Sequence, residues 1–181
     1  MRRAAVVAVL VVLGAVATRV AVPSRASHFR YSAALACGFE RWNVKTLKDR
    51  PHLLRAQTTT VAHLVSVRAP ASLPTIRLPF EYHVFRVVAA VTLKRLEADE
   101  DFHLVLRSGG KHMIAESPAR ECTTGATPYR RRQMVNSRKV VRLCANARVV
   151  GVAFFDFQHG QTGVAPNAIE LHPILDFVCQ V

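Results

Sequence analysis

The order of strand-like and helical segments in the second half of the chain most constrains its fold. Runs rich in Val, Phe, Leu and Ile with a period of two predict strands, and the pair Thr127-Pro128 supplies an N-cap and a first helical residue. These signals predict three strands, one helix and two further strands. The predicted strands are 82–96, 102–106, 113–115, 149–157 and 169–178, and the predicted helix is 127–143.

Short connections join the first three predicted strands. An acidic turn occupies 97–101, and Ser108-Gly109-Gly110 is typical of a hairpin turn. A helix between the third and fourth strands of such a meander is the arrangement of the oligonucleotide/oligosaccharide-binding (OB) barrel. We therefore predict a mainly β fold with one or two helices, built as a small five-stranded OB-like barrel. An open α+β sheet is the alternative.

The first residues have the three parts of a secretory signal. Met1-Arg2-Arg3 precedes an uncharged run from Ala4 to Thr18, which contains the cleavage triplet Ala15-Val16-Ala17. The run is shorter than the roughly 20 residues of a membrane span. We predict a signal peptide at 1–17, with cleavage after Ala26 and a retained anchor as alternatives, and no stable membrane span after cleavage. The expected location is secreted or in the bacterial cell envelope outside the cytoplasm.

The rest of the chain divides into an extension and one barrel domain. Thr58-Thr59-Thr60 predicts the N-cap of a short helix, and Pro70, Pro74 and Pro79 predict an extended connector. The expected organisation is an N-terminal extension at 18–80 and the OB-like barrel at 81–181. The length fits a single domain that can bury a core.

Four cysteines in an exported chain predict disulfides. Three pairings of Cys37, Cys122, Cys144 and Cys179 are possible. We favour Cys122 with Cys144, because the segment between them is predicted to be one helix that returns to the sheet, which leaves Cys37 to join Cys179. No pair has the C-x-x-C spacing of a metal-thiolate site.

The net charge of +13 indicates anionic partners. Nucleic acid, nucleotides and acidic envelope polymers all qualify, although Arg usage also follows genome composition. Arg130, Arg131 and Arg132 begin the densest basic patch and are candidate ligand-binding residues; a solvated helix face is the alternative. We expect a monomer.

Six polar side chains fall within 17 residues near the C-terminus. They are Asp156, His159, Gln161, Asn167, Glu170 and His172. Because side chains alternate along a strand, Glu170 and His172 are predicted on one face, and Asp156 and His159 could approach them across the loop. All six are candidate ligand-binding residues, with Asp101 and His103 as additional members.

Two chemical interpretations of this segment compete with a structural one. Asp156, His159, Glu170 and His172 could hold a divalent metal, the candidate cofactor. Alternatively, Glu170, His172 and His159 could act as acid-base catalysts. The structural interpretation is a clamp in which these side chains hold a loop whose Gly160 and Gly163 supply unusual backbone angles.

Several motifs together resemble a family of exported bacterial proteins, common in actinobacteria and without an assigned activity. They are R-W-x-V-K-T-L-x-D from Arg41, D-x-H-L-V-L from Asp101, M-I-x-E-x-P from Met113, and G-V-x-F-F-D from Gly151 followed by H-G-Q-T-G-V-A-P-N-x-I-E-L-H-P from His159. A weaker resemblance is to staphylococcal-nuclease-like OB barrels, through Asp99-Glu100-Asp101 and Glu116-Ser117-Pro118. Here Glu100 replaces the glycine of the nuclease turn, and the matching arginine pair is absent.

The leading hypothesis is an exported OB-like binding module for an anionic ligand. The alternatives are a metal-assisted, nuclease-like phosphodiester hydrolase and a structural envelope protein with no ligand. The sequence does not decide whether the protein is an enzyme.

Overall fold

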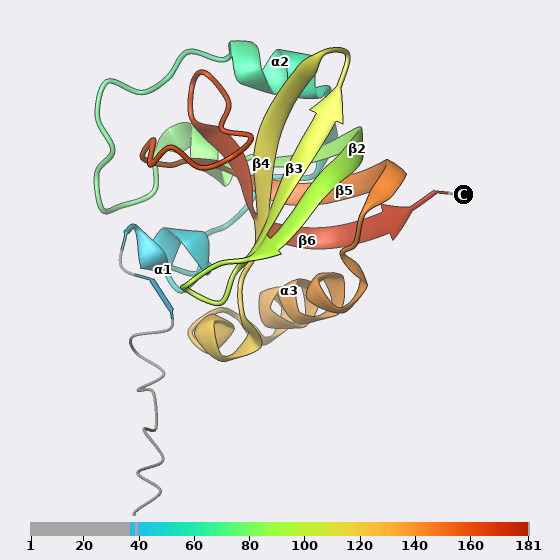
Figure 1. Cartoon of the computed structure of the whole chain (residues 1–181). Helices are drawn as coiled ribbons and strands as arrows, with labels where there is room; N and C mark the ends of the chain where they lie inside the picture. The colour runs from blue at the N-terminus through green and yellow to red at the C-terminus, as the bar shows by residue number, and fades with distance from the viewer. Residues whose placement is uncertain (1–36, 39, 181) are drawn as a thin grey trace, which may run out of the picture. The chain divides into compact units, whose positions relative to one another are not determined.

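Five strands close into a barrel in the computed structural model, which describes residues 37, 38 and 40–180 (Figure 1). They are β2 (Val84–Leu96), β3 (Phe102–Ser108), β4 (Lys111–Ser117), β5 (Cys144–Phe155) and β6 (Ile169–Cys179). The order around the barrel is β2-β3-β4-β6-β5, and pairing of β5 with β2 closes it. The β4–β6 pair is parallel and the others are antiparallel. This is the OB order, so the predicted fold class is confirmed. The predicted signal peptide lies outside the described residues.

Strand β2 pairs with two different strands of the barrel along its length, β5 and β3. Its first part pairs with β5 from Val84 onward, and its second part pairs with β3 up to Leu96, with register shifts near Val91. Such bulges let one strand bend sharply enough to belong to both halves.

The barrel interior is filled by alternate residues of each strand. Leu104 and Leu106 of β3, Met113 and Ala115 of β4, and Leu171 of β6 are fully buried in one core. Burying an aliphatic side chain of this size stabilises the fold by about 2 kcal/mol. The side chains between them point to the outer face of the same strands.

Helix α3 (Pro128–Val140) lies between β4 and β5 in sequence and packs against β6 (Figure 1). Thr127 Oγ1 accepts a hydrogen bond from the Arg130 amide, as the N-cap prediction requires. The helix ends three residues before the predicted Leu143, because Val141 already has extended backbone angles. Met134 and Ser137 face inward, and a second apolar cluster of Met134, Leu175 and Val150 joins the helix to the sheet.

The residues before the barrel wrap around it. They form α1 (Trp42–Lys45), the two-residue β1 (Gln57–Thr58), α2 (Val61–Ser66) and the 3-10 turn η1 (Pro79–Tyr82). Thr60 caps α2, as predicted, by accepting from the His63 amide. Strand β1, which the sequence did not predict, pairs in parallel with β2. In the described part of the chain, no helix has both the length and the apolar character needed to cross a membrane.

The predicted disulfide pairing is wrong. The bonds join Cys37 to Cys122 and Cys144 to Cys179. Cys122 lies in the 3-10 turn η2 (Arg120–Thr123) before α3, and Cys144 lies after that helix. A helix of 13 residues separates its ends by about 20 Å, whereas disulfide-bonded Cα atoms stand about 5.5 Å apart. Cys144 and Cys179 instead meet because β5 and β6 are antiparallel neighbours.

Candidate functional site

A set of charged side chains lies on the outer face of β3, β4 and β6. His103 of β3 pairs with Glu116 of β4, and Glu170 and His172 of β6 share their face. The alternating neighbours of these residues fill the barrel core. In OB barrels the outer face of the second and third strands is the usual ligand face, and β3 and β4 are those strands here.

This face is covered rather than open. Helix α1 places Lys45 against it, and the β5–β6 loop packs on the sheet at Gly163, where an added Cβ would stand 2.4 Å from Val105 Cγ2. Gly163 has a φ of 89°, so both its backbone and its space call for glycine. The result is a buried charge cluster, a name we use for Lys45, Asp101, His103, Glu116, Asp156, Glu170 and His172, all at most 8% exposed.

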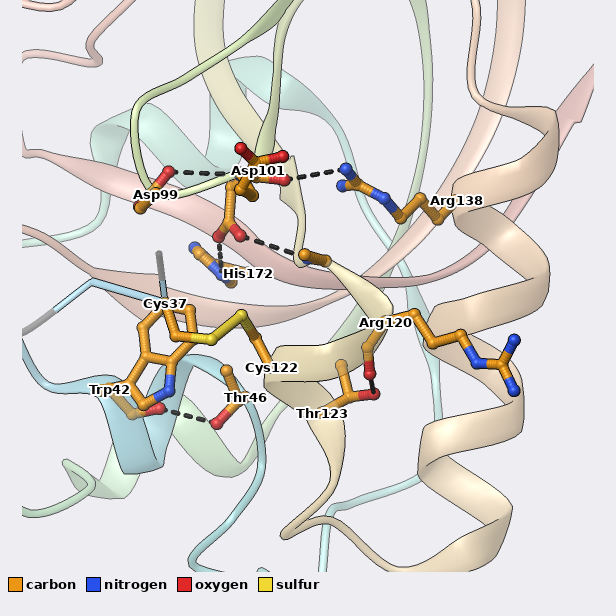
Figure 2. The surroundings of a disulfide bond; sticks show 12 residues. Cys37, Trp42, Thr46, Asp99, Asp101, Arg120, Cys122, Thr123, Arg138 and His172 are labelled. Atoms are coloured by element: carbon orange, nitrogen blue, oxygen red, sulfur yellow. Dashed lines mark hydrogen bonds and ion pairs between the residues drawn. A yellow bond between two sulfur atoms is a disulfide. The ribbon is translucent and has the colours of Figure 1, made fainter. Parts of the chain in front are cut away.

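Glu116 lies at the centre of the cluster. Its Oε1 stands 3.0 Å from His103 Nδ1, and its Oε2 stands 3.1 Å from His172 Nδ1. The other side of His172 faces Asp101, with 3.3 Å between Nε2 and Oδ2 (Figure 2). Asp101 Oδ1 accepts from the Ala119 amide, which fixes the turn before β3. Two imidazoles and two carboxylates therefore alternate in one chain of contacts.

Both ring nitrogens of His103 face hydrogen-bond acceptors. Its Nε2 stands 2.8 Å from the carbonyl oxygen of Thr162, which can only accept, and its Nδ1 faces the Glu116 carboxylate. Burial lowers the pKa of His103, but the bonds to Glu116 and Thr162 outweigh it and the net pKa is raised. These two contacts favour the imidazolium form of His103, and they tie β3 and β4 to the β5–β6 loop.

Lys45 neutralises the other end of the cluster. Its Nζ stands 2.6 Å from Asp156 Oδ2. Burial lowers the pKa of this ammonium, but Asp156, Glu170 and Glu116 raise it above its ordinary value. Nearby, Arg41 makes two hydrogen bonds to the buried carboxylate of Glu81 and one to the Phe155 carbonyl. These contacts attach α1 to the barrel through paired charges.

The pKa values of the acids in the cluster shift in opposite directions. Burial raises the pKa of Glu170 well above its ordinary value, and the charges of Glu116 and Asp156 raise it further. Burial also raises the pKa of Glu116, but the hydrogen bond with His103 and the ion pair with His172 reverse this and hold it well below its ordinary value. Burial lowers the pKa of His172, yet Asp101 and Glu116 bring it to about 10.

The four predicted metal ligands do not share one group among the described residues. His172 belongs with Asp101 and Glu116, whereas His159 belongs with Asp156 and Glu40 at the surface. His159 Nε2 stands 2.6 Å from Glu40 Oε2, and both side chains are about half exposed. A third group contains Glu97, His103 and Glu116. The metal and catalytic roles predicted for these residues stay predictions.

The remaining predicted residues in the loop have structural contacts. Asn167 Nδ2 donates to the carbonyls of Leu64 and Val67, each at 2.9 Å, and so holds the end of α2. Gly160 and Gly163 have the positive φ angles that the clamp interpretation predicts. Gln161 is half-buried, and its Oε1 has no hydrogen-bond partner within the described residues.

Sequence reasoning missed two members of the cluster. Glu116 was noted only in the nuclease resemblance, and Lys45 only in the motif that begins at Arg41. Neither residue lies near the C-terminal loop in sequence: Lys45 is 111 positions from Asp156. The position of Lys45 directly after the buried Val44 in the helix Trp42–Lys45 was the available signal.

A second feature is a basic depression along α3. One part, of about 340 Å³, is lined by Arg120, Pro128, Arg131, Arg132, Val135, Asn136 and Lys139. The adjoining part, of about 290 Å³, is lined by Phe102, Arg120, Val135, Arg138 and Lys139. We call the two together the α3 groove. It contains the predicted Arg131 and Arg132, while Arg130 instead bonds to Gln133 of its own helix.

The surface is more basic than the composition alone suggests. Five of the 12 acids are buried, namely Glu81, Asp101, Glu116, Asp156 and Glu170, against three of the 20 Lys and Arg residues that follow residue 36. The fold therefore buries a larger share of its acidic residues than of its basic residues, and the exposed surface has an excess of cations.

No protein-family model matches the chain, and no curated protein matches it in sequence. Among solved structures, a Leishmania major protein assigned as an aspartyl-tRNA synthetase has a TM-score of 0.44 and 12% identity, over 71% of this chain and 22% of that chain. Entamoeba histolytica asparaginyl-tRNA synthetase has a TM-score of 0.40 and 11% identity, over 70% of this chain and 24% of that chain. This chain spans about a quarter of the length of those proteins. Such distant likenesses carry no functional argument.

Proposed function

We propose that this protein is an exported OB-like module that binds an anionic polymer along the α3 groove. The observation that carries the proposal is the convergence of Arg120, Arg131, Arg132, Arg138 and Lys139 on two adjoining depressions. Arg131 Nε is buried there and has no hydrogen-bond partner in the described part of the chain. An unpaired guanidinium donor beside other cations favours a ligand with several negative charges.

The usual OB ligand face, on the outside of β3 and β4, is a weaker candidate for ligand binding than the α3 groove. It is covered by α1 and the β5–β6 loop, and its charges already neutralise one another. The α3 groove begins where that face ends, because Arg138 donates to the carbonyls of Glu100 and Ser117 at the edge of β3 and β4. Figure 2 shows Arg138 reaching from α3 toward the turn that holds Asp101.

Recognition in the groove would depend on charge rather than on base stacking. Phe102 is the aromatic residue of the groove lining, and Lys94 and Arg138 each lie 3.9 Å from its ring centroid. These cations lie over the Phe102 ring, on which a nucleobase would otherwise stack. A ligand read through phosphate or other anionic groups, without sequence preference, fits this arrangement.

An extracytoplasmic location agrees with the two disulfides, which are typical of oxidising compartments. We include the signal peptide and membership in the exported bacterial family in the proposal. The disulfide Cys37–Cys122 joins the N-terminal segment to η2, whose Arg120 lines both parts of the groove.

Binding of a labelled 20-nucleotide oligo(dT) and of labelled polyphosphate, followed by fluorescence anisotropy at several salt concentrations, tests the proposal. The triple variant R131A/R132A/K139A is expected to bind both probes at least ten-fold more weakly and to show a shallower salt dependence, because fewer counterions are released. Alanine is a good helix former, so α3 should persist.

The matched control is R55A/R107A/K111A, which removes three exposed cations outside the groove lining. It carries the same net charge as the groove variant and should keep most of the affinity. Equal weakening of both variants would show that binding follows net charge alone and would contradict the proposed site. Absence of binding by the unmodified protein to either probe at low salt would reject the function.

A further inference from the structure

A depression of about 560 Å³ lies beside α3 on the outer face of β2, β5 and β6. Its charged lining residues are Arg86 of β2, Arg148 of β5 and Asp176 of β6. Val150 of β5 pairs with both Arg86 and Asp176, so neighbouring strands bring these side chains to the same face. We call this feature the sheet depression, and Figure 1 shows α3 next to β6, one of the strands of its floor.

The helical period places the sheet depression and the α3 groove on two different sides of α3. Val135 and Arg138 line the groove, whereas Ser137 and Val140 line the depression. Residues three apart share a helix face, so each pair marks one side. The exposed Asn136 lines both features and lies between the two sides. A continuous path therefore runs from the groove, over α3 at Asn136, into the depression.

The sheet depression keeps a net positive charge, with two arginines against one aspartate. Arg86 Nη1 donates to the Thr58 hydroxyl at 3.2 Å, a neutral partner that leaves the arginine charge uncompensated. Arg148 Nη2 stands 3.0 Å from Asp176 Oδ2, but the two side chains are 32% and 47% exposed. Because water screens so exposed a pair, an anionic ligand can share the Arg148 guanidinium, which has five N–H donors.

We propose that the polymer bound in the α3 groove bends over α3 at Asn136 and continues into the sheet depression. This inference rests on the proposed function and narrows its ligand to a flexible, unpaired chain of closely spaced phosphate groups. The cations Arg132 and Lys139, which lie one helical turn before and after Asn136, flank the crossing. Single-stranded nucleic acid and inorganic polyphosphate both have this chemistry.

The crossing excludes a nucleic-acid duplex as a ligand that fills both sites. A helix with its side chains is about 10–12 Å across, so the ligand must turn within that distance. Duplex DNA has a persistence length of about 500 Å, whereas an unpaired strand bends between successive nucleotides. A duplex would therefore contact one side of α3 and leave the other unoccupied.

The test compares R86Q/R148Q with R107Q/K111Q, which removes two exposed cations at the β3–β4 turn and so matches the loss of charge. Fluorescence anisotropy measures binding of labelled 20-nucleotide oligo(dT) and of labelled long-chain polyphosphate, and calorimetry measures binding of tripolyphosphate. We expect R86Q/R148Q to bind both long probes at least five-fold more weakly than R107Q/K111Q does. Tripolyphosphate is too short to cross α3 and should bind both variants equally, in the groove, where cations are more numerous.

A 20-base-pair duplex provides a second readout at the same salt concentration. Although it carries more phosphates than oligo(dT), the unmodified protein should bind it at least five-fold more weakly, because it cannot turn over α3. R86Q/R148Q should lose most of this preference for the single strand. If R86Q/R148Q does not fold, V140E compared with K111Q gives the same test, because Val140 is exposed and its new negative charge would stand in the sheet depression.

Equal affinity of R86Q/R148Q and R107Q/K111Q for the long probes would overturn the path over α3, as would equal affinity for duplex and single strand. If R131A/R132A/K139A still weakens binding in that case, the proposed groove stands and only this inference fails. Failure of the unmodified protein to bind any probe would reject the proposed function together with the inference. A loss confined to oligo(dT) or to polyphosphate would support the path and identify the source of the phosphate groups.

Discussion

Lys45 Nζ lies 2.6 Å from Asp156 Oδ2, and both side chains are buried between α1 and the barrel. The pair joins the N-terminal segment to the end of β5. Removing one member of a buried ion pair leaves the other charge without compensation. This contact is therefore expected to contribute strongly to attachment of the N-terminal segment.

Replacing Lys45 with methionine is expected to lower the free energy of unfolding by about 3–5 kcal/mol. The variant keeps the aliphatic volume but leaves Asp156 unpaired beside Glu170 and Glu116. Chemical denaturation followed by circular dichroism measures the change. The exposed Lys48 provides the control: K48M should change stability by less than about 0.5 kcal/mol. Similar stability of K45M and K48M would contradict the importance of the pair.

Stability is expected to fall as pH rises from neutral toward 10. The folded-state pKa of His172 is about 10, above its ordinary value of 6.5, because Asp101 and Glu116 favour the imidazolium despite its burial. The resulting stabilisation is complete below pH 6.5 and is lost as pH approaches 10. Glu170 acts in the same direction, since its raised pKa means that ionising it in the folded state is unfavourable.

At low pH the dependence has the opposite sign, and stability is expected to fall as pH decreases. The pKa of Glu116 is lowered on folding from an ordinary value of 4.5, so its contribution is complete above that pH and is lost on further acidification. The thermal midpoint should therefore be highest near pH 4.5 and should fall further above pH 6.5, and scanning calorimetry across pH 3–10 measures it. A midpoint that stayed level from pH 6.5 to 10 would show that His172 is not held as an imidazolium.

Loss of either disulfide is expected to destabilise the protein considerably. The bonds connect residues 85 and 35 positions apart, and loop-closure entropy predicts about 4 kcal/mol for each. C37S/C122S and C144S/C179S should each lower the denaturation midpoint, with the first having the somewhat larger effect. Peptide mapping without reduction checks the connectivity, and a fragment joining Cys122 to Cys144 would contradict it.

Asn167 is expected to stabilise the fold through α2. Its side-chain amide donates to the carbonyl of Leu64 in that helix and to the carbonyl of Val67, the residue that caps its C-terminus. Asn167→Ala removes both donors and should cost about 1–3 kcal/mol. The exposed Gln158, with one bond to Pro166, gives a control that should change little. Stability of N167A equal to that of Q158A would show that the two bonds contribute nothing.

The fold could be predicted from the sequence because its signals are local. Alternation along 102–106 and 169–178, the hairpin turn at Gly109-Gly110 and the cap at Thr127-Pro128 each depend on neighbouring residues, and their order is compatible with few topologies. Alternation also predicts correctly that Glu170 and His172 share a face, since side chains of a strand point to opposite sides in turn.

The partners of those side chains depended on the path of the whole chain. Lys45, Asp101 and Glu116 meet Asp156, Glu170 and His172 because α1 crosses the outer face of the barrel and β4 pairs with β6. The cysteine pairing followed from the length of α3 and the register of β5 against β6. Local periodicity determined which residues point outward; only tertiary packing decided which outward residues became buried, because burial depends on the distant segments that cover them.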